Sequence, residues 1–318
     1  MVILIMSLDF SEILVTGGAG FIGSHLVDRL LYEGVKVKVV DNLITGEKKN
    51  LAQHKDKKAL QFIEGDIRNF NLVKKIVKGV EAVFHEAALV SVTESLENPV
   101  LSNEVNVTGT VNLLKACVDA NVKRFVFASS CAVYGDSETL PKHENLMPMP
   151  LSPYAVSKLA AENYVKVFDQ VYGLESTVLR YFNVYGTRQN FGPYSGVISV
   201  FKNRLLENKP LMIYGDGEQT RDFVNVKDVV DANMLALSNR NVRSEVFNIG
   251  MGESITITKL AKTIQEIMGK TDSEIVYAKS RPGDVGHSYA DIGKARKIMH
   301  YEPKTQLEKG LTELISKQ

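Results

Sequence analysis

A glycine-rich loop between two stretches of different periodicity constrains the fold of this chain more than any other feature. Residues 12–15 are an apolar stretch typical of a strand, and Thr-Gly-Gly-Ala-Gly-Phe-Ile-Gly-Ser follows at once and opens a helical pattern that extends to about residue 32. Gly17, Gly20 and Gly23 have the spacing G-x-x-G-x-x-G. In such loops the first glycine permits a tight turn, the second lets the backbone approach a pyrophosphate, and the third lets the helix pack on the strand. We therefore predict an α/β fold that binds the phosphates of a dinucleotide at this helix N-terminus.

The second predicted strand ends in an acidic residue. Residues 35–40 are followed by Asp41, at roughly 20 residues beyond the loop, as the dinucleotide fingerprint requires. A carboxylate at this position accepts hydrogen bonds from the adenosine ribose and repels a 2′-phosphate, so we predict NAD as the cofactor rather than NADP. Further cofactor contacts are expected at the helix start and at the following strand ends, from Phe21, Ile22, Asn42, Asp66, Ile67, Ala87 and Ala88.

Strands and helices alternate through the first half of the chain. Residues 60–63, 82–85 and 124–128 are further predicted strands, separated by helical patterns. This alternation predicts a doubly wound, mostly parallel Rossmann sheet, in which ligands lie at the carboxyl ends of the strands. His85 stands at one such end, where a histidine is more typical of an orienting hydrogen-bonding residue than of a catalytic base, although the second role stays open.

Tyr154 and Lys158 form a Tyr-x-x-x-Lys step on a predicted helix. A helix brings residues four apart onto one face, so the ammonium of Lys158 is expected near the phenol of Tyr154. A neighbouring cation would lower the pKa of the phenol from its ordinary value near ~10 toward neutrality, where it could take a proton from an alcohol and return it. The pair alone is common on surface helices, but together with the glycine loop it indicates acid/base chemistry beside a nicotinamide.

Taken together, these motifs resemble the extended short-chain dehydrogenase/reductase family, and within it the nucleotide-sugar epimerases and dehydratases of the UDP-galactose 4-epimerase type. The resemblance covers nearly the whole chain, and its motifs are residues 16–24, Asp41 with Asn42, and residues 85–88, 129–135, 152–158, 180–186 and 215–226. It implies a smaller, discontinuous substrate-binding lobe. The NAD-binding domain is then residues 1–182 plus about 223–250, and the lobe is about 183–222 plus 251–318. Family members commonly pair through helices around residues 103–120 and 154–172, so a homodimer is expected.

The resemblance also assigns roles to individual residues. Ser130 would hydrogen-bond the reacting sugar hydroxyl beside Tyr154 as the base and Lys158 as its electrostatic partner and ribose anchor, with Ser129 as a lesser candidate. The partner implied is a UDP-sugar. Its expected contacts are Asn183, Arg221 and Arg281 at the diphosphate, Tyr214 under the uracil, Asp284 at the uridine ribose, and Val197 and Ser288 in the pocket. No metal is expected.

The residues after the strand-end serines distinguish between reactions in this family. Dehydratases and decarboxylases carry an acidic residue between the serine and the following Val-Tyr-Gly, whereas this chain has Cys131 and Ala132. The resemblance therefore implies a 4-epimerase that works through a 4-keto sugar with NAD and without net oxidation. A small residue at Ser288, where epimerases restricted to UDP-glucose and UDP-galactose can have tyrosine, implies turnover of UDP-GlcNAc and UDP-GalNAc alongside, or in preference to, the plain hexoses.

Other functions stay open on the same fold. One is a UDP-glucuronate 4-epimerase. Another is a GDP-4-keto-6-deoxymannose epimerase/reductase. Cys131 resembles the catalytic cysteine of that group, although Gly196 stands where the group has its catalytic histidine. A third is a catalytically inactive NAD-sensing regulator, but such proteins usually lose the tyrosine or lysine that this chain keeps.

Composition limits these possibilities further. The 318 residues carry a net charge of +1, which argues against a nucleic-acid partner, and 44% of them are apolar, as in an ordinary globular core. The two cysteines, Cys117 and Cys131, give no disulfide framework and indicate a cytoplasmic protein. Residues 1–6 are apolar but far too short to span a bilayer and unlike a signal peptide, and translation could begin at either Met1 or Met6. No membrane partner is expected.

Overall fold

The structure is a computed structural model, and it describes residues 9–189, 196–280 and 285–316. Three features discussed above lie outside these residues: the apolar start with Met1 and Met6, and the expected substrate contacts Arg281 and Asp284.

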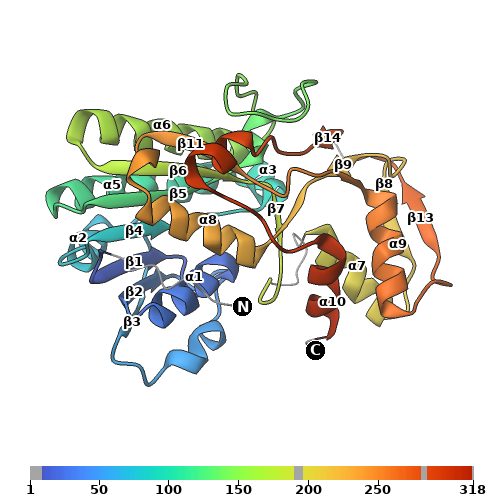
Figure 1. Cartoon of the computed structure of the whole chain (residues 1–318), viewed down its shortest axis with the longest axis horizontal. Coiled ribbons are helices and arrows are strands. Elements are labelled where there is room, and N and C mark those ends of the chain that lie inside the picture. The colour runs from blue at the N-terminus through green and yellow to red at the C-terminus, as the bar shows by residue number, and fades with distance from the viewer. Residues whose placement is uncertain (1–8, 190–195, 281–284, 317–318) are drawn as a thin grey trace.

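Seven parallel strands form the central sheet (Figure 1), in the order β11-β6-β5-β4-β1-β2-β3. The strands are β1 (Glu12–Thr16), β2 (Lys36–Asp41), β3 (Leu60–Glu64), β4 (Ala82–His85), β5 (Arg124–Ser130), β6 (Glu175–Tyr181) and β11 (Glu245–Ile249). From β1 the chain first proceeds outward to β2 and β3, and then crosses to the other side for β4. The strand order thus reverses between β1 and β4, and ligands of such sheets bind at this point. The predicted doubly wound parallel sheet is confirmed.

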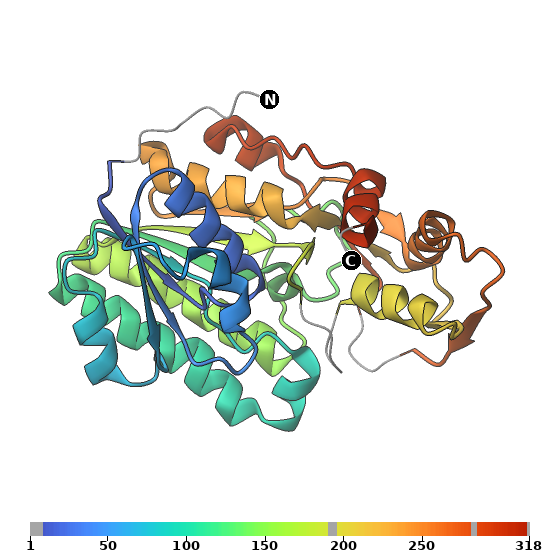
Figure 2. The same cartoon turned by 90° about the horizontal axis from the view of Figure 1, so that it is seen from below.

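Helices cover both faces of this sheet (Figures 1 and 2), and each face has its own apolar core. One core contains α1 (Phe21–Tyr32) and α8 (Val226–Ser238), and the other contains α2 (Phe70–Ile76), α5 (Gly109–Asp119) and α6 (Pro153–Tyr172). Strands buried on both faces need continuous apolar sequences, and this explains the Val, Ile and Phe runs from which the strands were predicted.

The ends of α6 explain where the Tyr-x-x-x-Lys step lies. Ser152 caps the helix, because its Oγ accepts a hydrogen bond from Ala155 N at 3.2 Å, and Pro153 occupies the first turn, where it is tolerated. The helix ends at Gly173 with φ of +73°. Tyr154 is consequently in the first turn of the helix, beside the carboxyl ends of β5 and β6.

The helix predicted over residues 103–120 is interrupted. Its first part, η2 (Glu104–Thr108), is a π-helical turn that follows α3 (Val92–Glu97) and α4 (Pro99–Asn103), and α5 begins only at Gly109. A Cβ on Gly109 would be 2.6 Å from Cδ1 of Ile67, so a side chain has no room there. Shorter helical turns are η1 (Lys48–His54), η3 (Cys131–Tyr134), η4 (Arg240–Val242) and η5 (Ala295–Met299).

A third apolar core lies in a smaller lobe beside the carboxyl ends of the strands (Figure 1). Its helices are α7 (Val197–Leu206), α9 (Ile257–Met268) and α10 (Leu307–Ser316), and its strands are β8 (Leu211–Tyr214) and β13 (Ile275–Ala278). Short strands connect the lobe to the sheet: β7 (Asn183–Tyr185), β9 (Thr220–Arg221), β10 (Phe223–Asn225), β12 (Ile255–Thr256) and β14 (His287–Ser288). The chain enters this lobe twice, before α8 and after β11. The predicted domain boundaries stay a prediction.

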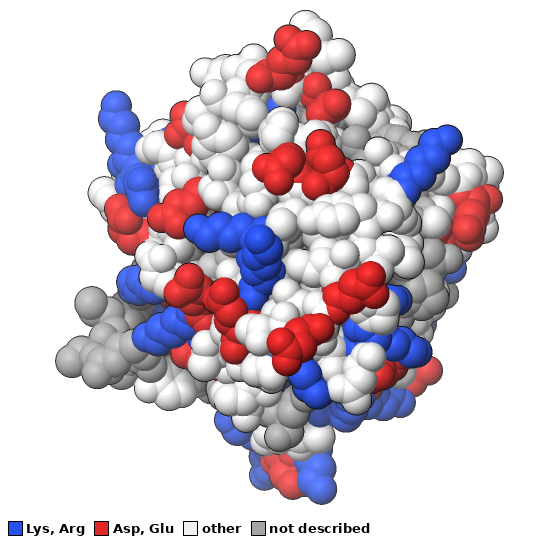
Figure 3. Space-filling model, turned by 90° about the vertical axis from the view of Figure 1, so that its right-hand side faces the viewer, with Lys and Arg blue, Asp and Glu red and all other residues white. Residues whose placement is uncertain are grey.

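Acidic and basic side chains are interspersed on the face that the lobe presents in Figure 3.

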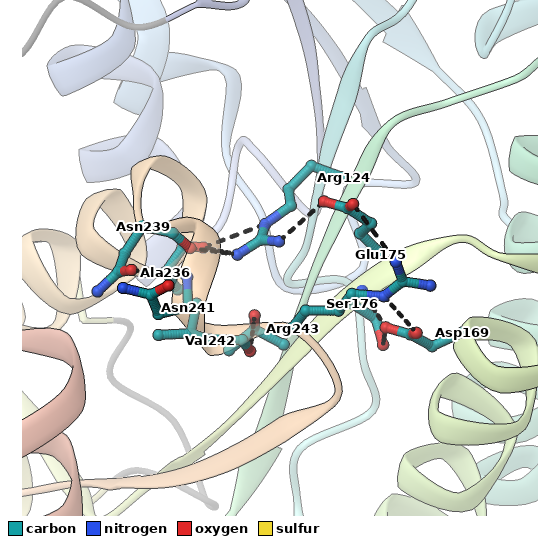
Figure 4. A network of polar contacts seen from close by, with 10 residues as sticks. Arg124, Asp169, Glu175, Ser176, Ala236, Asn239, Asn241, Val242 and Arg243 are labelled. Atoms are coloured by element: carbon teal, nitrogen blue, oxygen red, sulfur yellow. Dashed lines mark hydrogen bonds and ion pairs between the residues drawn. The ribbon is translucent and has the colours of Figure 1, made fainter.

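The opposite, amino end of β5 and β6 is held by a polar network (Figure 4). Arg124 donates to the carbonyl oxygens of Ala236 at 2.9 Å and Asn239 at 2.7 Å, at the end of α8. Its Nη1 lies 3.3 Å from the carboxylate of Glu175 on β6. Arg243 then joins Glu175 to Asp169 of α6. The strands whose other ends carry the site are therefore fixed to helices on both faces of the sheet.

Candidate active site

The glycine loop has no space for side chains. Gly17 has φ of +67°, and a Cβ there would be 2.8 Å from Ala87 N, while a Cβ on Gly23 would be 2.3 Å from the Gly17 carbonyl oxygen. Gly20 caps α1 without a side-chain hydrogen bond, so the first turn, which starts with Phe21 and Ile22, presents its backbone N–H groups. The loop therefore fits the pyrophosphate of a dinucleotide, as predicted.

Asp41 ends β2 and is buried against this loop. Its Oδ2 accepts a hydrogen bond from Ala19 N at 2.9 Å and its Oδ1 from Leu43 N at 2.8 Å. Burial raises the pKa of the carboxyl group, and these backbone donors act to lower it. Asp41 therefore also shapes the glycine loop, a role that the sequence did not predict. A carboxylate oxygen has further acceptor capacity, so the residue still fits the expected ribose contact.

The expected cofactor contacts Asn42, Asp66 and Ile67 lie after the ends of β2 and β3. Asn42 donates to Asp66 Oδ2 at 3.1 Å, and Arg68 pairs with the same carboxylate at 2.8 Å. The hydrogen bonds and charge of Arg68 hold the pKa of Asp66 down at about 2. Asp66 and Arg68 line a hollow on the surface together with Asn69, Glu104 and Thr108. Ile67 is buried beneath this edge.

His85 is a buried hydrogen-bonding residue of the sheet. Its Nδ1 lies 2.7 Å from Thr16 Oγ1, and its Nε2 lies 2.9 Å from Thr110 Oγ1, which itself donates to the Asn106 carbonyl. This arrangement places the proton of the imidazole on Nε2 and makes Nδ1 an acceptor. Burial lowers the pKa of His85 to about 3. Thr16 Oγ1 also accepts from Ala87 N at 3.2 Å, so the histidine orients the start of the Ala87–Ala88 segment. These contacts support the orienting role of His85 rather than the alternative role as a catalytic base.

Ser130 and Tyr154 meet at the end of β5. Tyr154 is only 8% exposed, and its backbone N donates to Ser95 Oγ at 3.1 Å. Burial raises the pKa of its phenol to about 12, although a hydrogen bond with Ser130 acts in the opposite direction. Ser130 Oγ also accepts from Ala132 N at 3.2 Å. The structure thus brings the two expected catalytic hydroxyls together.

Lys158 lies one helical turn beyond Tyr154 and is almost fully buried. Its Nζ donates to the Ala128 carbonyl at 2.8 Å and lies 5.1 Å from the centre of the Phe127 ring. Burial lowers the pKa of Lys158 to about 8, although the charges of Glu86 and Glu162 oppose this. Burial thus dominates the pKa of Tyr154 in these contacts, where the ammonium of Lys158 is engaged with Ala128, and the lowering of this pKa by Lys158 stays a prediction.

Ser129, the lesser candidate, points away from Tyr154. It donates to Glu162 Oε1 at 2.5 Å, and the same carboxylate receives two hydrogen bonds from Arg180, at 2.9 and 2.7 Å. All three side chains are buried. Ser129 is therefore part of a structural ion-pair network that fixes α6 to β5 and β6.

A second carboxylate at the strand ends was not singled out from the sequence. Glu86 follows β4, and its Oε1 accepts a hydrogen bond from Tyr181 Oη at 2.9 Å. Burial raises the pKa of Glu86 to about 7, against the effects of Tyr181 and of the Lys158 charge. In the sequence, the only indication that Glu86 belongs to the site was its position directly after His85.

Ser288 lies beside Cys131, the residue that follows Ser130. It is 7% exposed and pairs with Arg221 in the β14–β9 register. Burial raises the pKa of the neighbouring Cys131 thiol to about 11, and the charge of Arg221 and a hydrogen bond with Ser288 oppose this. The Cys131 charge in turn affects Tyr154. Ser288, Arg221, Cys131 and Tyr154 are thus neighbours.

Asp222 holds the segments around Ser288 and Arg221 together. Its carboxylate accepts hydrogen bonds from the backbone N atoms of Met251, Gly252 and Ala290 at 2.7, 3.0 and 3.1 Å. Burial raises the pKa of Asp222 to about 6, and the three donors act to lower it. Its carbonyl oxygen accepts from the side-chain amide of Asn183 at 3.0 Å.

The remaining expected substrate contacts are in the lobe. Tyr214 ends β8 opposite Ala278, and Val197 begins α7. Among the described residues, no group of three or more His, Cys, Asp or Glu side chains is placed to hold a metal ion. No helix in the described part of the chain is long and apolar enough to cross a membrane.

Comparisons with known proteins agree with this site. The model of the NAD dependent epimerase/dehydratase family matches residues 13–250. A putative UDP-glucose 4-epimerase from Methanocaldococcus jannaschii is 44% identical, over 96% of this chain and 97% of the relative. The crystal structure of the Thermotoga maritima UDP-glucose 4-epimerase with UDP-glucose is 42% identical with a TM-score of 0.91, and it covers 96% of this chain and 97% of its own.

A third similar protein is named for a different sugar. The UDP-N-acetylglucosamine 4-epimerase from Methanobrevibacter ruminantium M1, solved in complex with UDP-N-acetylmuramic acid, is 39% identical with a TM-score of 0.91, over 96% of this chain and 97% of that protein. The predicted resemblance is confirmed. The chain is an NAD-dependent enzyme that belongs to the NAD dependent epimerase/dehydratase family, with UDP-sugar 4-epimerases among its relatives.

Proposed function

We propose that this protein interconverts UDP-GlcNAc and UDP-GalNAc, and also UDP-glucose and UDP-galactose, by inverting the fourth carbon of the sugar. The observation that carries the proposal is the meeting of Ser130 and Tyr154 at the carboxyl end of β5, with Lys158 one helical turn further, where the following residues Cys131 and Ala132 supply no acid. Because positions 131 and 132 lack the acid that dehydratases of this family carry there, a ketone formed at this site is expected to return to the alcohol.

Each catalytic residue has a distinct part in this reaction. Ser130 orients the sugar 4-hydroxyl through a hydrogen bond, and Tyr154 accepts its proton and later returns it. NAD supplies the hydride acceptor and donor, together with a positively charged ring. Lys158 contributes positive charge from the next turn of α6 and hydrogen-bonding capacity for the cofactor ribose. Burial of Tyr154 keeps bulk water from competing for the proton.

The diphosphate and the base are bound on the lobe side. Arg221 and Arg281 suit the phosphate oxygens because a guanidinium group binds them bidentately, and Asn183 adds an amide donor. Tyr214 offers an aromatic face for the uracil, and Asp284 a carboxylate for the uridine ribose. Val197 completes the apolar part of the pocket. With UDP held in this way, the 4-keto sugar can rotate and present its other face.

Ser288 supports the acceptance of N-acetyl sugars. It is small, buried, and beside Cys131 near the reacting hydroxyls. A larger residue in a close-packed wall would exclude an acetamido group. The competing epimerase/reductase function needs a reactive cysteine, whereas burial raises the pKa of the Cys131 thiol to about 11 and keeps it protonated.

A homodimer through α6 is part of the proposal. Val156, Tyr164, Val167 and Val171 leave between 44% and 66% of their surfaces exposed on this helix. Apolar side chains gathered on one exposed face are typical of an interaction surface.

The test is a panel of UDP-sugars given to the purified protein without added reductant. UDP-GlcNAc, UDP-GalNAc, UDP-glucose and UDP-galactose should interconvert within each pair, and NADH should not accumulate. UDP-glucuronate and GDP-4-keto-6-deoxymannose serve as the alternative substrates. Stoichiometric consumption of NADPH, or formation of a 4-keto-6-deoxy product, would show that the proposal is wrong.

A further inference from the structure

Glu86 stands where two strand ends of the sheet meet. The β4–β5 register pairs His85 with Phe127, so the next residue of each strand, Glu86 and Ala128, are also neighbours. Ala128 is the residue whose carbonyl accepts the hydrogen bond from Lys158 Nζ at 2.8 Å. Glu86 therefore follows the strand next to Ala128, and its charge acts on the Lys158 ammonium without forming one of the ion pairs found among the described residues.

The hydrogen bonds around Glu86 favour its ionised form. Asn233 donates through Nδ2 to the Val229 carbonyl at 2.8 Å and to Tyr181 Oη at 2.7 Å, which fixes the direction of its amide. Tyr181 Oη thus accepts from Asn233 Nδ2, and its own proton has two acceptors, Glu86 Oε1 at 2.9 Å and Asn233 Oδ1 at 3.1 Å, of which the carboxylate is the nearer and the charged one. A donor chain that ends on a carboxylate stabilises the negative charge.

Other charges near Lys158 are already compensated. Glu162 on the same helix is paired bidentately with Arg180 of β6. His85 of β4 is neutral, because burial lowers its pKa to about 3. From β5 the ammonium meets the Phe127 ring and the Ala128 carbonyl. Among the described residues that act on Lys158, Glu86 is consequently the one carboxylate without a cation of its own.

We infer that Glu86 is a positioning residue, whose carboxylate keeps the Lys158 ammonium protonated while Tyr154 exchanges protons with the substrate. This inference rests on the proposed function. Burial brings both groups toward the same range: it raises the pKa of Glu86 to about 7 and lowers the pKa of Lys158 to about 8, and each charge opposes the shift of the other. Between these values both are ionised and stabilise one another.

Glu86→Gln tests the inference, because the amide oxygen can still accept from Tyr181 while the charge is lost. The pKa of Lys158 is measured in protein labelled with ¹³Cε-lysine, and Lys158→Met assigns the signal. An opposite charge within about 4–6 Å typically shifts a pKa by one to three units, and Glu86 makes no direct ion pair with Lys158, so the Lys158 midpoint should fall by about one pH unit, at the lower end of this range. The alkaline limb of kcat/KM should move to lower pH by the same amount, because activity is lost as Lys158 deprotonates.

Glu64→Gln is the matched control. Glu64 ends β3 at the carboxyl edge of the same sheet and is paired with the exposed Lys48 at 2.8 Å, so the variant loses the same charge far from Lys158. Its Lys158 midpoint should stay within about 0.3 units of the wild type, because solvent screens exposed charges.

The wild-type titration is a second measurement that needs no variant. Its Lys158 signal should have an additional inflection near pH 7, where Glu86 titrates. A single inflection, or an unchanged midpoint in Glu86→Gln, would overturn the inference and leave Glu86 as a structural partner of Tyr181. A shifted midpoint in a protein that turns over no UDP-sugar would support the coupling and refute the proposed function instead.

Discussion

Replacing Ser288 with tyrosine should separate the two substrate pairs. Ser288 is 7% exposed and its neighbours are Cys131 and Arg221. The backbone on either side is also held, by the bonds Gly286 N to Asp136 and Ala290 N to Asp222. We therefore expect the phenol of Ser288→Tyr to occupy the space proposed for the acetamido group.

The expected loss of activity of Ser288→Tyr toward the N-acetyl sugars follows from close packing. Overpacking a well-packed site costs about 1–3 kcal/mol, which corresponds to a roughly 5- to 150-fold decrease in kcat/KM for UDP-GlcNAc and UDP-GalNAc. UDP-glucose and UDP-galactose have only a hydroxyl at the second carbon of the sugar, where the other two substrates carry the acetamido group. Their kcat/KM should therefore change by less than about threefold. Ser288→Ala, which keeps the pocket open, should retain both activities.

The assay is chromatographic separation of the UDP-sugar pairs over a range of substrate concentrations. Thermal unfolding of both variants controls for loss of structure. Equal loss of both activities, or of neither, would remove Ser288 from the specificity argument.

The other predictions concern the catalytic pair, the buried ion pair and the exposed face of α6. Tyr154→Phe should leave folding and NAD content nearly intact and lower kcat by about 10²- to 10⁴-fold, whereas Lys158→Met should lower both kcat and the NAD retained on gel filtration. Arg180→Met leaves Glu162 buried and unpaired, so urea unfolding should give a loss of about 3–5 kcal/mol, and the double variant with Glu162→Gln should recover part of it; additive losses would contradict this. Val171→Asp should convert the proposed homodimer to monomer in sedimentation experiments with little change in monomer stability, and a dimer that persists in the variant would place the interface elsewhere.

The fold was predictable because its signals are local. Strand and helix periodicities, the glycine loop and Asp41 follow from residues close together in sequence. The five strands predicted over residues 12–15, 35–40, 60–63, 82–85 and 124–128 begin and end within two residues of the observed ones. The predicted helix over 103–120 was the exception, because no sequence pattern distinguishes the π-turn at Glu104–Thr108 from regular helix.

The polar environment of the site was not predictable for a physical reason. Glu162 and Arg180 are 18 residues apart, and Asp222 binds backbone amides 29, 30 and 68 residues away, so their partners depend on the finished fold. The pKa of Tyr154 depends on burial, which the spacing to Lys158 does not reveal. The pairing of Tyr154 with Ser130 was predicted from family resemblance rather than from local sequence.

The segment from Gly286 to Asp291 is held through its main chain. Gly286 N bonds to Asp136, Ala290 N to Asp222, and Lys142 exchanges backbone hydrogen bonds with Tyr289 and Asp291. None of these bonds involves the side chain at position 288. Evolution can therefore exchange that side chain without moving the loop. With the role proposed for Ser288, a single substitution would give a new sugar preference while Ser130 and Tyr154 stay in place.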